Sequence, residues 1–295
     1  MYNQIDSNKR RTAYLFFGFS LFVIAVGWIF SSVYNSPIIL IIAVLISIFQ
    51  SWFSYYFADA VALATSGAVE APVAQFPDLH HVVENLAITA GLPKPKIYVI
   101  NDPAPNAFAT GRNPKNASVA VTTGLLQIME KRELEGVLAH ELSHVGNYDI
   151  LVMTVTVTLV GSIVLLSDIF MRSLWFRGRD DKNNDSGGYL MIVGIVLAIL
   201  SPVFAKLIEL AISRKREYLA DASGALLTRF PEGLASALEK IEQYDEPMRR
   251  VNRATAHLYI SEPYGDAGKK QSWLQAIAST HPPIEDRIAK LRAMA

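Results

Sequence analysis

The sequence contains no cysteine among its 295 residues. This absence excludes disulfide bonds, thiol nucleophiles and thiolate metal ligands, so a metal site in this chain must use His, Asp or Glu side chains. Charge is also scarce: Asp, Glu, Lys and Arg make up only 18% of the chain, whereas hydrophobic residues make up 51%. The mean hydropathy of +0.26 is too high for an ordinary soluble domain. The composition therefore predicts membrane-spanning segments.

The longest stretch without a charged side chain runs from Thr12 to Ala58. A helix needs about 20 apolar residues to cross the bilayer core, so this stretch is long enough for two spans. Asn35, Ser36 and Pro37 interrupt it with a turn signal. We therefore predict an N-terminal transmembrane hairpin in residues 1–57, with spans at about 13–33 and 38–57.

Two further uncharged stretches occupy residues 150–167 and 186–205. Each has about the length of one bilayer crossing, which predicts a second hairpin in residues 150–205, with spans at about 150–168 and 187–205. Long buried helices of a globular domain are the alternative. The polar connector from Met171 to Gly188 is predicted to be a mobile loop. The expected fold is a mainly α membrane protein with four transmembrane helices and an α+β catalytic domain that has a small β-sheet.

Residues 58–149, between the hairpins, have the texture of the first half of a globular domain. Leu79 to Ala90 has helical periodicity, and the β-rich runs Lys96–Ile100 and Ala117–Thr122 predict two strands. A stretch of small residues from Pro105 to Gly111 lies between the strands and is predicted to be a loop. Helix and strands together indicate a small α+β unit.

The motif at residues 140–144 carries the chemistry of this domain. His140 and His144 are separated by one helical turn, so both imidazoles can reach one Zn²⁺ ion. Glu141 is placed to act as a general base on a metal-activated water. A surface helix whose histidines bind nothing is the alternative. The charged run Lys131–Glu135 leads into the motif and indicates a site at the membrane surface, which argues against a site inside a span.

Residues 206–295 are predicted to form the mostly helical second half of the domain. A zinc site with two histidines needs a third protein ligand, and Glu217 is the best downstream candidate. Asp221, one turn later, is placed to orient a ligand histidine as an outer carboxylate. The alternative is a solvated charged helix, in which residues 214–216 (Arg-Lys-Arg) pair with both carboxylates.

Four motifs occur in a fixed order along the chain. They are the Asn106–Gly111 segment, the His-Glu-Leu-Ser-His helix, the segment Ser213–Asp221, and Thr280-His281-Pro282-Pro283 with Arg287 and Ile288. Together with four hydrophobic spans, these motifs resemble the HtpX-type membrane zinc metalloproteases, gluzincins that are related to the CAAX-prenyl proteases. The resemblance covers essentially the whole chain.

The resemblance implies one Zn²⁺ per chain, held by His140, His144 and Glu217, with Glu141 as the catalytic base. It also places His281 near the cleft, where an imidazole donor would stabilise the tetrahedral oxyanion. A capping role beside Pro282 and Pro283 is the alternative for His281. Arg287 is similar to a family arginine near the site, and a salt bridge is its alternative role.

The resemblance further implies that an extended substrate pairs with a strand edge. Either the segment at Asn106–Gly111, where Asn106, Ala107 and Phe108 are the candidate contacts, or the strand Ala117–Thr122 would provide that edge. Pairing through main-chain groups allows many substrate sequences to be accepted. The remaining histidines, at positions 80, 81 and 257, are predicted to lie on the surface.

The implied function is that of a membrane-bound zinc endopeptidase in quality control of misfolded or damaged membrane proteins; a non-catalytic zinc-binding membrane scaffold is the alternative. Its expected partners are the lipid bilayer and polypeptide substrates, and the net charge of zero gives no indication of nucleic-acid binding. Lys9, Arg10 and Arg11 precede the first span and favour a cytoplasmic N-terminus. The resemblance implies a bacterial inner membrane with the site facing the cytoplasm. Basic residues of the Met171–Gly188 connector oppose this orientation. The oligomeric state stays open.

Overall fold

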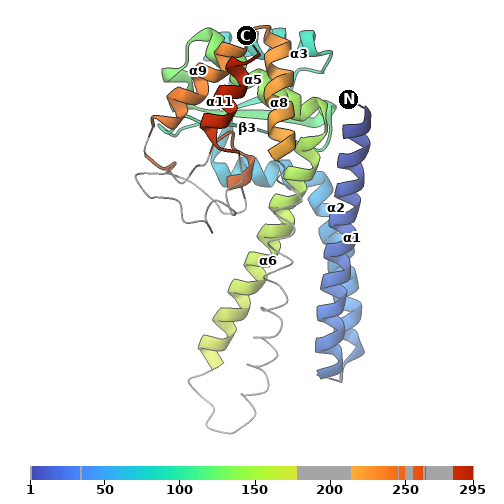
Figure 1. The fold of residues 1–295 in the computed structure, drawn as a ribbon. Helices are drawn as coiled ribbons and strands as arrows, with labels where there is room; N and C mark the ends of the chain where they lie inside the picture. The colour runs from blue at the N-terminus through green and yellow to red at the C-terminus, as the bar shows by residue number, and fades with distance from the viewer. Residues whose placement is uncertain are drawn as a thin grey trace.

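A computed structural model describes residues 2–33, 35–177, 214–244, 246–249, 255–261, 263 and 282–294. Within these residues, a globular domain forms one end of the molecule, and three helices extend from it in the same direction (Figure 1). The predicted fourth span and His281 lie outside the described residues.

The first two helices form the predicted N-terminal hairpin. Helix α1 (Tyr2–Val33) and helix α2 (Pro37–Ser66) are both long and apolar enough to cross a membrane. Large hydrophobic side chains along them are exposed, as expected of a lipid-facing surface, among them Phe17, Leu21, Trp28, Leu45, Ile48 and Phe49. Both helices are longer than the predicted spans. Helix α1 begins before residue 13 and helix α2 continues past residue 57, because the charged residues that end the uncharged stretch do not end the helices.

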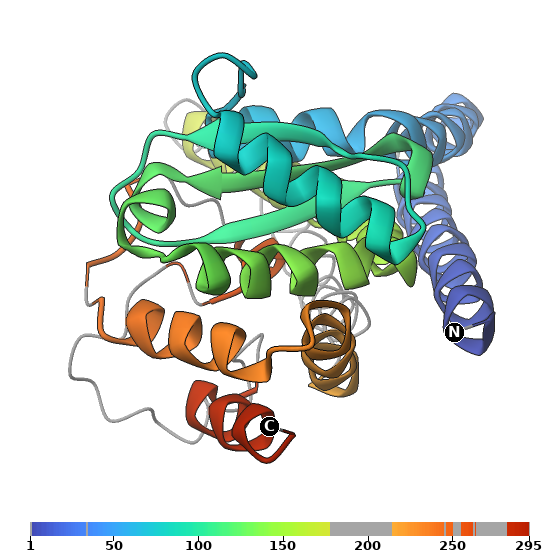
Figure 2. The ribbon, with the colours of Figure 1, turned by 90° about the horizontal axis from the view of Figure 1, so that it is seen from above.

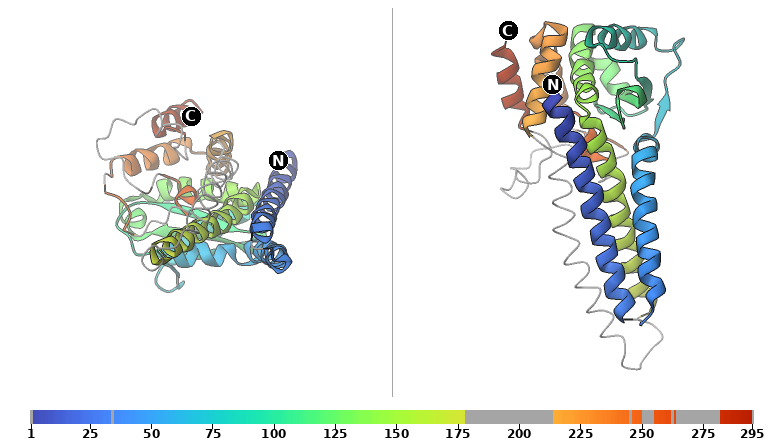
Figure 3. Two further views of the ribbon diagram at one scale, coloured as in Figure 1. Left: turned by 90° about the horizontal axis from the view of Figure 1, so that it is seen from below. Right: turned by 90° about the vertical axis from the view of Figure 1, so that its right-hand side faces the viewer.

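Helix α6 (Asp149–Arg177) contains the predicted third span and contacts both α1 and α2 (Figure 3). Its segment Asp149–Ile163 meets the length and hydropathy requirement for a span together with helix α5 (Lys131–Gly146), from which it is bent by 83°. Among the described residues there are thus two candidate spans, or three if this bent pair counts as one. The prediction of a loop from Met171 onward is wrong as far as Arg177, because α6 continues to that residue.

The domain contains a four-stranded sheet with the order β1-β2-β4-β3. Its strands are β1 (Ala68–Glu70), β2 (Lys96–Ile100), β3 (Ala107–Gly111) and β4 (Ala117–Thr122). Strands β2 and β4 pair in parallel and have the predicted bounds, whereas the other two pairings are antiparallel. The short strand β1 was not among the predicted elements.

Strand β3 lies where the sequence predicted a loop. All five of its residues are buried, because β3 packs between β4 and the helices α5 and α6. Such close packing requires small side chains. A run of small residues is also typical of loops, and the prediction of a loop at Pro105–Gly111 is therefore wrong for residues 107–111. Since β4 is paired on both sides, the expectation that Ala117–Thr122 pairs with a substrate is wrong. Of the two segments expected to pair with a substrate, only strand β3 lies at an edge of the sheet.

The helices of the domain pack either on the sheet or on helix α5. They are α3 (Pro77–Ala90), α4 (Thr123–Ile128), α5, α8 (Arg214–Thr228), α9 (Pro231–Glu242) and α11 (Ile284–Arg292), with the 3₁₀ turns η1 (Pro114–Asn116) and η2 (Ala256–Leu258). Seen from above, the sheet is followed by α5, then by α8 and α9, and then by α11 (Figure 2). Helix α5 therefore lies at the centre of the domain, between the sheet and the C-terminal helices.

Two glycines bring helices unusually close to α5. A Cβ atom at Gly224 of α8 would lie 3.0 Å from the His140 backbone nitrogen, and a Cβ atom at Gly136 of α5 would lie 2.6 Å from the Leu234 backbone nitrogen in α9. The absence of these side chains lets the backbones approach closely. Side chains from α8 can therefore reach the histidines of α5.

Candidate metal centre

Helix α5 begins with a capping box formed by Glu130 and Glu133, and it buries the predicted motif near its C-terminal end. His140, Glu141 and His144 are all less than 5% exposed. The two Nε2 atoms of the histidines lie 3.2 Å apart, with the imidazole rings nearly perpendicular at 88°. The one-turn spacing thus aims both Nε2 atoms at a common point.

Glu217 reaches the same point from the first turn of α8. One carboxylate oxygen lies 3.5 Å from His144 Nε2, and the other lies 3.7 Å from His140 Nε2. Ligands about 2.1 Å from a tetrahedral Zn²⁺ ion are separated from one another by about 3.4 Å. The distance between the two Nε2 atoms, and the distance from each Nε2 atom to an oxygen of Glu217, are both close to this value. The donor atoms therefore fit a single zinc ion.

The other ring nitrogens of the two histidines each face a carboxylate. His140 Nδ1 lies 2.9 Å from Asp221 Oδ1, and His144 Nδ1 lies 3.1 Å from Asp149 Oδ2. A carboxylate at Nδ1 holds a proton there and leaves the Nε2 lone pair available for a metal. This donor set suits a metal cation, because two neutral imidazoles and one carboxylate then converge on it.

Asp221 is backed by a fully buried arginine from α11. Arg287 donates two hydrogen bonds to the two Asp221 oxygens, at 2.9 and 2.7 Å, and a third to the Ile260 carbonyl at 3.1 Å. Burial raises the pKa of Asp221, but the charge of Arg287 and the bonds from His140 and Arg287 outweigh it and lower the pKa to about 2. Arg287 therefore forms the salt bridge and also lies near the site, which were the two roles considered for it. Its partner Asp221 contacts His140 of the cluster.

Asp149 supports His144 and was not found from the sequence. Its other oxygen accepts a hydrogen bond of 2.7 Å from Asn8 in α1 and lies 3.5 Å from Arg216 Nε in α8. Burial lowers the pKa of His144, yet the hydrogen bond to Asp149 and the charge of Glu217 raise it to about 9. A carboxylate just past the end of the helix that carries His140 and His144 was the available signal, but Asp149 directly precedes the uncharged stretch 150–167 and belongs to no recognised motif.

Glu141 lies on the same helix with its carboxyl group buried. Burial raises its pKa to about 7, with a further upward contribution from Glu217, while His144 and the backbone N–H of Ala109 act in the opposite direction. A carboxyl group with this pKa can exchange a proton near neutral pH.

The edge of β3 faces this site. The outward backbone groups belong to Ala107 and Ala109: the Ala107 carbonyl accepts a hydrogen bond of 3.0 Å from Ile260, and the Ala109 N–H faces Glu141. The Asn106 side chain donates to the Ser261 carbonyl at 3.2 Å. The Phe108 ring is fully buried and contacts Tyr259 edge-on, so it offers no exposed surface.

The remaining histidines lie apart from the cluster. The prediction of a surface position is wrong for His257, which is 3% exposed and has its Nε2 atom 3.0 Å from the Met153 carbonyl. His80 is partly buried and makes a similar contact of 2.9 Å with the Ala71 carbonyl, whereas His81 is exposed. His281 lies outside the described residues, so its role stays a prediction.

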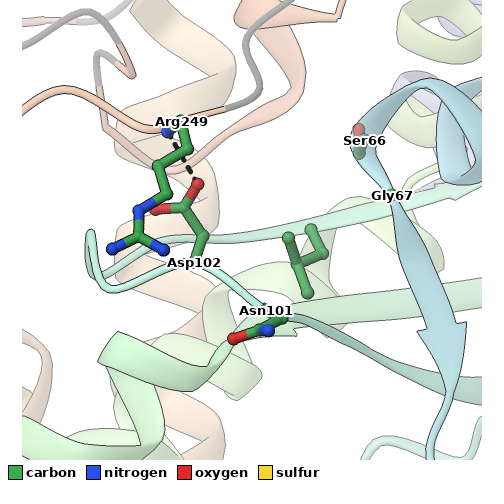
Figure 4. Close-up of a pocket in the computed structure, with 6 residues that line it drawn as sticks. Ser66, Gly67, Asn101, Asp102 and Arg249 are labelled. Atoms are coloured by element: carbon green, nitrogen blue, oxygen red, sulfur yellow. Dashed lines mark hydrogen bonds between the residues drawn. The ribbon is translucent and has the colours of Figure 1, made fainter.

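A separate pocket of about 290 Å³ lies where α2 and β2 end (Figure 4). Its lining includes Ser66, Asn101, Asp102 and Arg249. One Asp102 oxygen accepts the Arg249 backbone N–H at 2.8 Å, and the other accepts the Ala104 backbone N–H at 3.0 Å. None of the residues that line this pocket belongs to the metal cluster.

Comparison with known proteins gives consistent matches. Residues 73–295 match peptidase family M48. A protease HtpX homolog of Caldanaerobacter subterraneus is 47% identical, with 100% of this chain and 98% of the relative covered. A protease HtpX homolog of Streptococcus gordonii is 42% identical, with both chains fully covered. A crystal structure of S. mikatae Ste24p aligns with 99% of this chain and 67% of its own, at 15% identity and a TM-score of 0.49.

These matches agree with a membrane-anchored domain in which His140, His144 and Glu217 form a potential metal site. The family match covers all of helix α5 and also Glu217. The similarity to the relatives extends over the N-terminal hairpin as well. The chain therefore belongs to peptidase family M48 and is a membrane metalloprotease of the HtpX type.

Proposed function

We propose that this metalloprotease is a zinc endopeptidase, with the ion held by His140, His144 and Glu217. The observation that carries the proposal is the convergence of donor atoms from three buried residues beside the carboxyl group of Glu141: the two Nε2 atoms lie 3.2 Å apart, and each lies 3.5 or 3.7 Å from an oxygen of Glu217. Asp221 and Asp149 support it, because they hold the two imidazoles in the tautomer that ligates through Nε2.

When bound, zinc supplies Lewis acidity that polarises a carbonyl group and lowers the pKa of water. Glu141 accepts the proton of the attacking water and delivers it to the leaving amine. In the metal-free site, burial raises the pKa of Glu141 to about 7, so its carboxyl group can both accept and release a proton near neutral pH. The Ala109 N–H favours the ionised form of Glu141, which is present before the first transfer and after the second.

The substrate in this proposal is an extended polypeptide that pairs with the edge of β3. Asn106 and Ala107 are the proposed contacts, and because both are buried, the residues that cover them must move aside before a substrate can reach them. The Ala107 carbonyl already accepts the Ile260 N–H, so a substrate strand must replace that bond or begin beyond it. The buried ring of Phe108 supports the strand from behind and makes no contact of its own with the substrate.

The location in this proposal is a bacterial inner membrane with the site on the cytoplasmic side. Asn8 near the start of α1 contacts Asp149, so the N-terminal end of α1 and the metal cluster share one side of the membrane. Lys9, Arg10 and Arg11 favour the cytoplasm for that side. A site held against the membrane is suited to misfolded or damaged membrane proteins, which are the proposed substrates.

The test compares zinc content and casein cleavage of the detergent-purified wild type with those of Glu141→Gln and Glu217→Ala. We expect about one zinc per chain and cleavage by the wild type, zinc without cleavage for Glu141→Gln, and loss of zinc for Glu217→Ala. Glu135→Gln is the matched control, because Glu135 lies on the same helix and pairs with Arg132 at the surface.

Undiminished cleavage by Glu141→Gln would contradict the catalytic assignment. The chain would then be better described as a non-catalytic zinc-binding membrane scaffold.

A further inference from the structure

The corner between α5 and α6 adjoins the metal cluster. Helix α5 ends at Gly146, Asn147 caps it, and Tyr148 adopts a φ of 60° before α6 begins at Asp149. A positive φ is uncommon for a tyrosine and needs support from its surroundings. Asp149 leaves this corner and contacts His144 with one oxygen. The orientation of a cluster histidine therefore depends on how the corner is held.

The N-terminal helix α1 holds the corner from outside. Asn8 is only 1% exposed, and its amide nitrogen lies 2.9 Å from the Asn147 carbonyl and 2.7 Å from Asp149 Oδ1. The two hydrogen bonds join the end of α5 to the start of α6. Lys9, the next residue, lies 4.9 Å above the ring of Tyr148.

The amide of Asn8 is fully used. Both of its hydrogen-bond donors reach the corner, and its carbonyl oxygen lies 3.4 Å from a guanidinium nitrogen of Arg216 in α8. Burying a polar amide is costly unless each group finds a partner, so this position is demanding for any other side chain. Asn8 thereby links the anchor helix to both Asp149 and the helix that carries Glu217.

We propose that Asn8 is a positioning residue of the metal centre, acting through Asp149 on His144, so that the membrane anchor is itself part of the zinc-binding site. This inference rests on the proposed zinc function. The line of contacts runs from the Asn8 amide to one oxygen of Asp149, and from the other oxygen to His144 Nδ1. Outer partners of this kind fix the orientation of a metal ligand and tune its affinity for the metal.

The test measures the zinc dissociation constant of the full detergent-purified chain by competition with a chromophoric chelator. Asn8→Leu keeps the volume but removes both donors, and we expect it to weaken zinc binding about 3- to 10-fold. Asn8→Asp keeps the shape but sets a carboxylate against Asp149, and we expect a larger loss. Thr12→Val is the matched control. Thr12 is buried one turn away in the same helix, and its hydroxyl donates to the backbone carbonyl of Asn8 and not to the side-chain amide.

A second readout separates positioning from packing. If Asn8 acts through Asp149, Asn8→Leu has no further effect on zinc affinity when it is introduced into the Asp149→Asn variant. The visible spectrum of the cobalt-substituted protein is expected to change in Asn8→Leu but not in Thr12→Val, since it reports the arrangement of the metal ligands.

Two results would overturn the inference while leaving the zinc site intact: wild-type zinc affinity in both Asn8 variants, or an equal loss of affinity with and without Asp149. A wild-type chain that binds no zinc at all would instead overturn the proposed function.

Discussion

The two histidines of the cluster are supported in different ways. His140 faces Asp221, which is tied by two hydrogen bonds to the guanidinium of Arg287 in α11. His144 faces Asp149, which is tied to the neutral amide of Asn8 in α1 and lies 3.5 Å from Arg216. One support lies within the C-terminal helices of the domain, whereas the other reaches the membrane anchor.

The difference shows what each support can contribute. A fully buried ion pair costs much to break, because removal of one partner leaves the other charge buried and alone. A neutral amide carries no such penalty, and its loss changes mainly the orientation of the carboxylate. We therefore expect the loss of the Asp221–Arg287 ion pair to affect both folding and metal binding, and the loss of the Asn8 amide to affect chiefly metal binding.

The largest effect is expected from Asp221→Asn. This change removes the charge that pairs with the buried guanidinium of Arg287 and leaves the Ile260 carbonyl and the charges of Glu217 and Glu141 as its described partners, so it should lower the free energy of unfolding by about 3–5 kcal/mol. Thermal or denaturant unfolding of the metal-free protein measures it. Asn8→Leu is the comparison and should cost clearly less, because it removes a neutral amide and leaves every charge paired.

The double variant Asp221→Asn with Arg287→Met sharpens this result. Removing both charges should restore part of the lost stability without restoring zinc affinity, because His140 still lacks its carboxylate. Equal stability losses for Asp221→Asn and Asn8→Leu would remove the distinction between the ion pair and the neutral amide.

An intermediate effect is expected from Gly224→Ala, which tests how close α8 must lie to α5. The added Cβ atom would meet the His140 backbone at 3.0 Å, so the helices must separate, at a cost of about 1–3 kcal/mol. Glu217 and Asp221 would then move away from His140, and zinc affinity should fall as well.

Gly18→Ala in α1 provides the control for this variant, since a Cβ atom there would meet nothing within 4 Å. If Gly224→Ala binds zinc as tightly as Gly18→Ala does, the close approach of α8 is unimportant for the site.

The smallest effect is expected in the number of protons released when zinc binds. The pKa of His144 is raised from 6.5 to about 9, so the metal-free protein carries a proton on His144 at pH 8 that a zinc ligand cannot keep. Zinc binding at pH 8 should release about one proton, and the release should decline as the pH rises through 9. Correspondingly, His144 stabilises the metal-free fold below pH 6.5 and loses this contribution as the pH rises through about 9.

Calorimetric zinc titrations in buffers of different ionisation enthalpy measure the release. Asp149→Asn removes the hydrogen bond that raises the pKa of His144 and should reduce the release at pH 8. An unchanged release in Asp149→Asn would show that Asp149 does not control His144.

The comparison also explains how far the sequence could predict the site. The spacing of His140, Glu141 and His144 is local, so the sequence alone predicted one helix face with two ligands and a base. That assignment rests on periodicity, which a sequence displays directly. Glu217 and Asp221 are one turn apart and so share a helix face, but their connection to the two histidines came from the family resemblance.

The other support depends on contacts that no local pattern encodes. Asn8 and Asp149 are 141 residues apart and meet only because α1 packs against the corner between α5 and α6. Strand β3 was missed for a related reason, since its small residues reflect tight packing against helices. The fully buried position of His257 likewise follows from tertiary packing.

The most direct test of the account is X-ray absorption at the zinc edge of the purified protein. We predict a zinc ion with two imidazole nitrogens at about 2.0–2.1 Å and a carboxylate oxygen at about 2.0–2.2 Å, and loss of one imidazole in His144→Ala. The control His81→Ala, at an exposed histidine, should leave the spectrum unchanged. A zinc environment that His144→Ala does not alter would contradict the central claim that this cluster binds the metal.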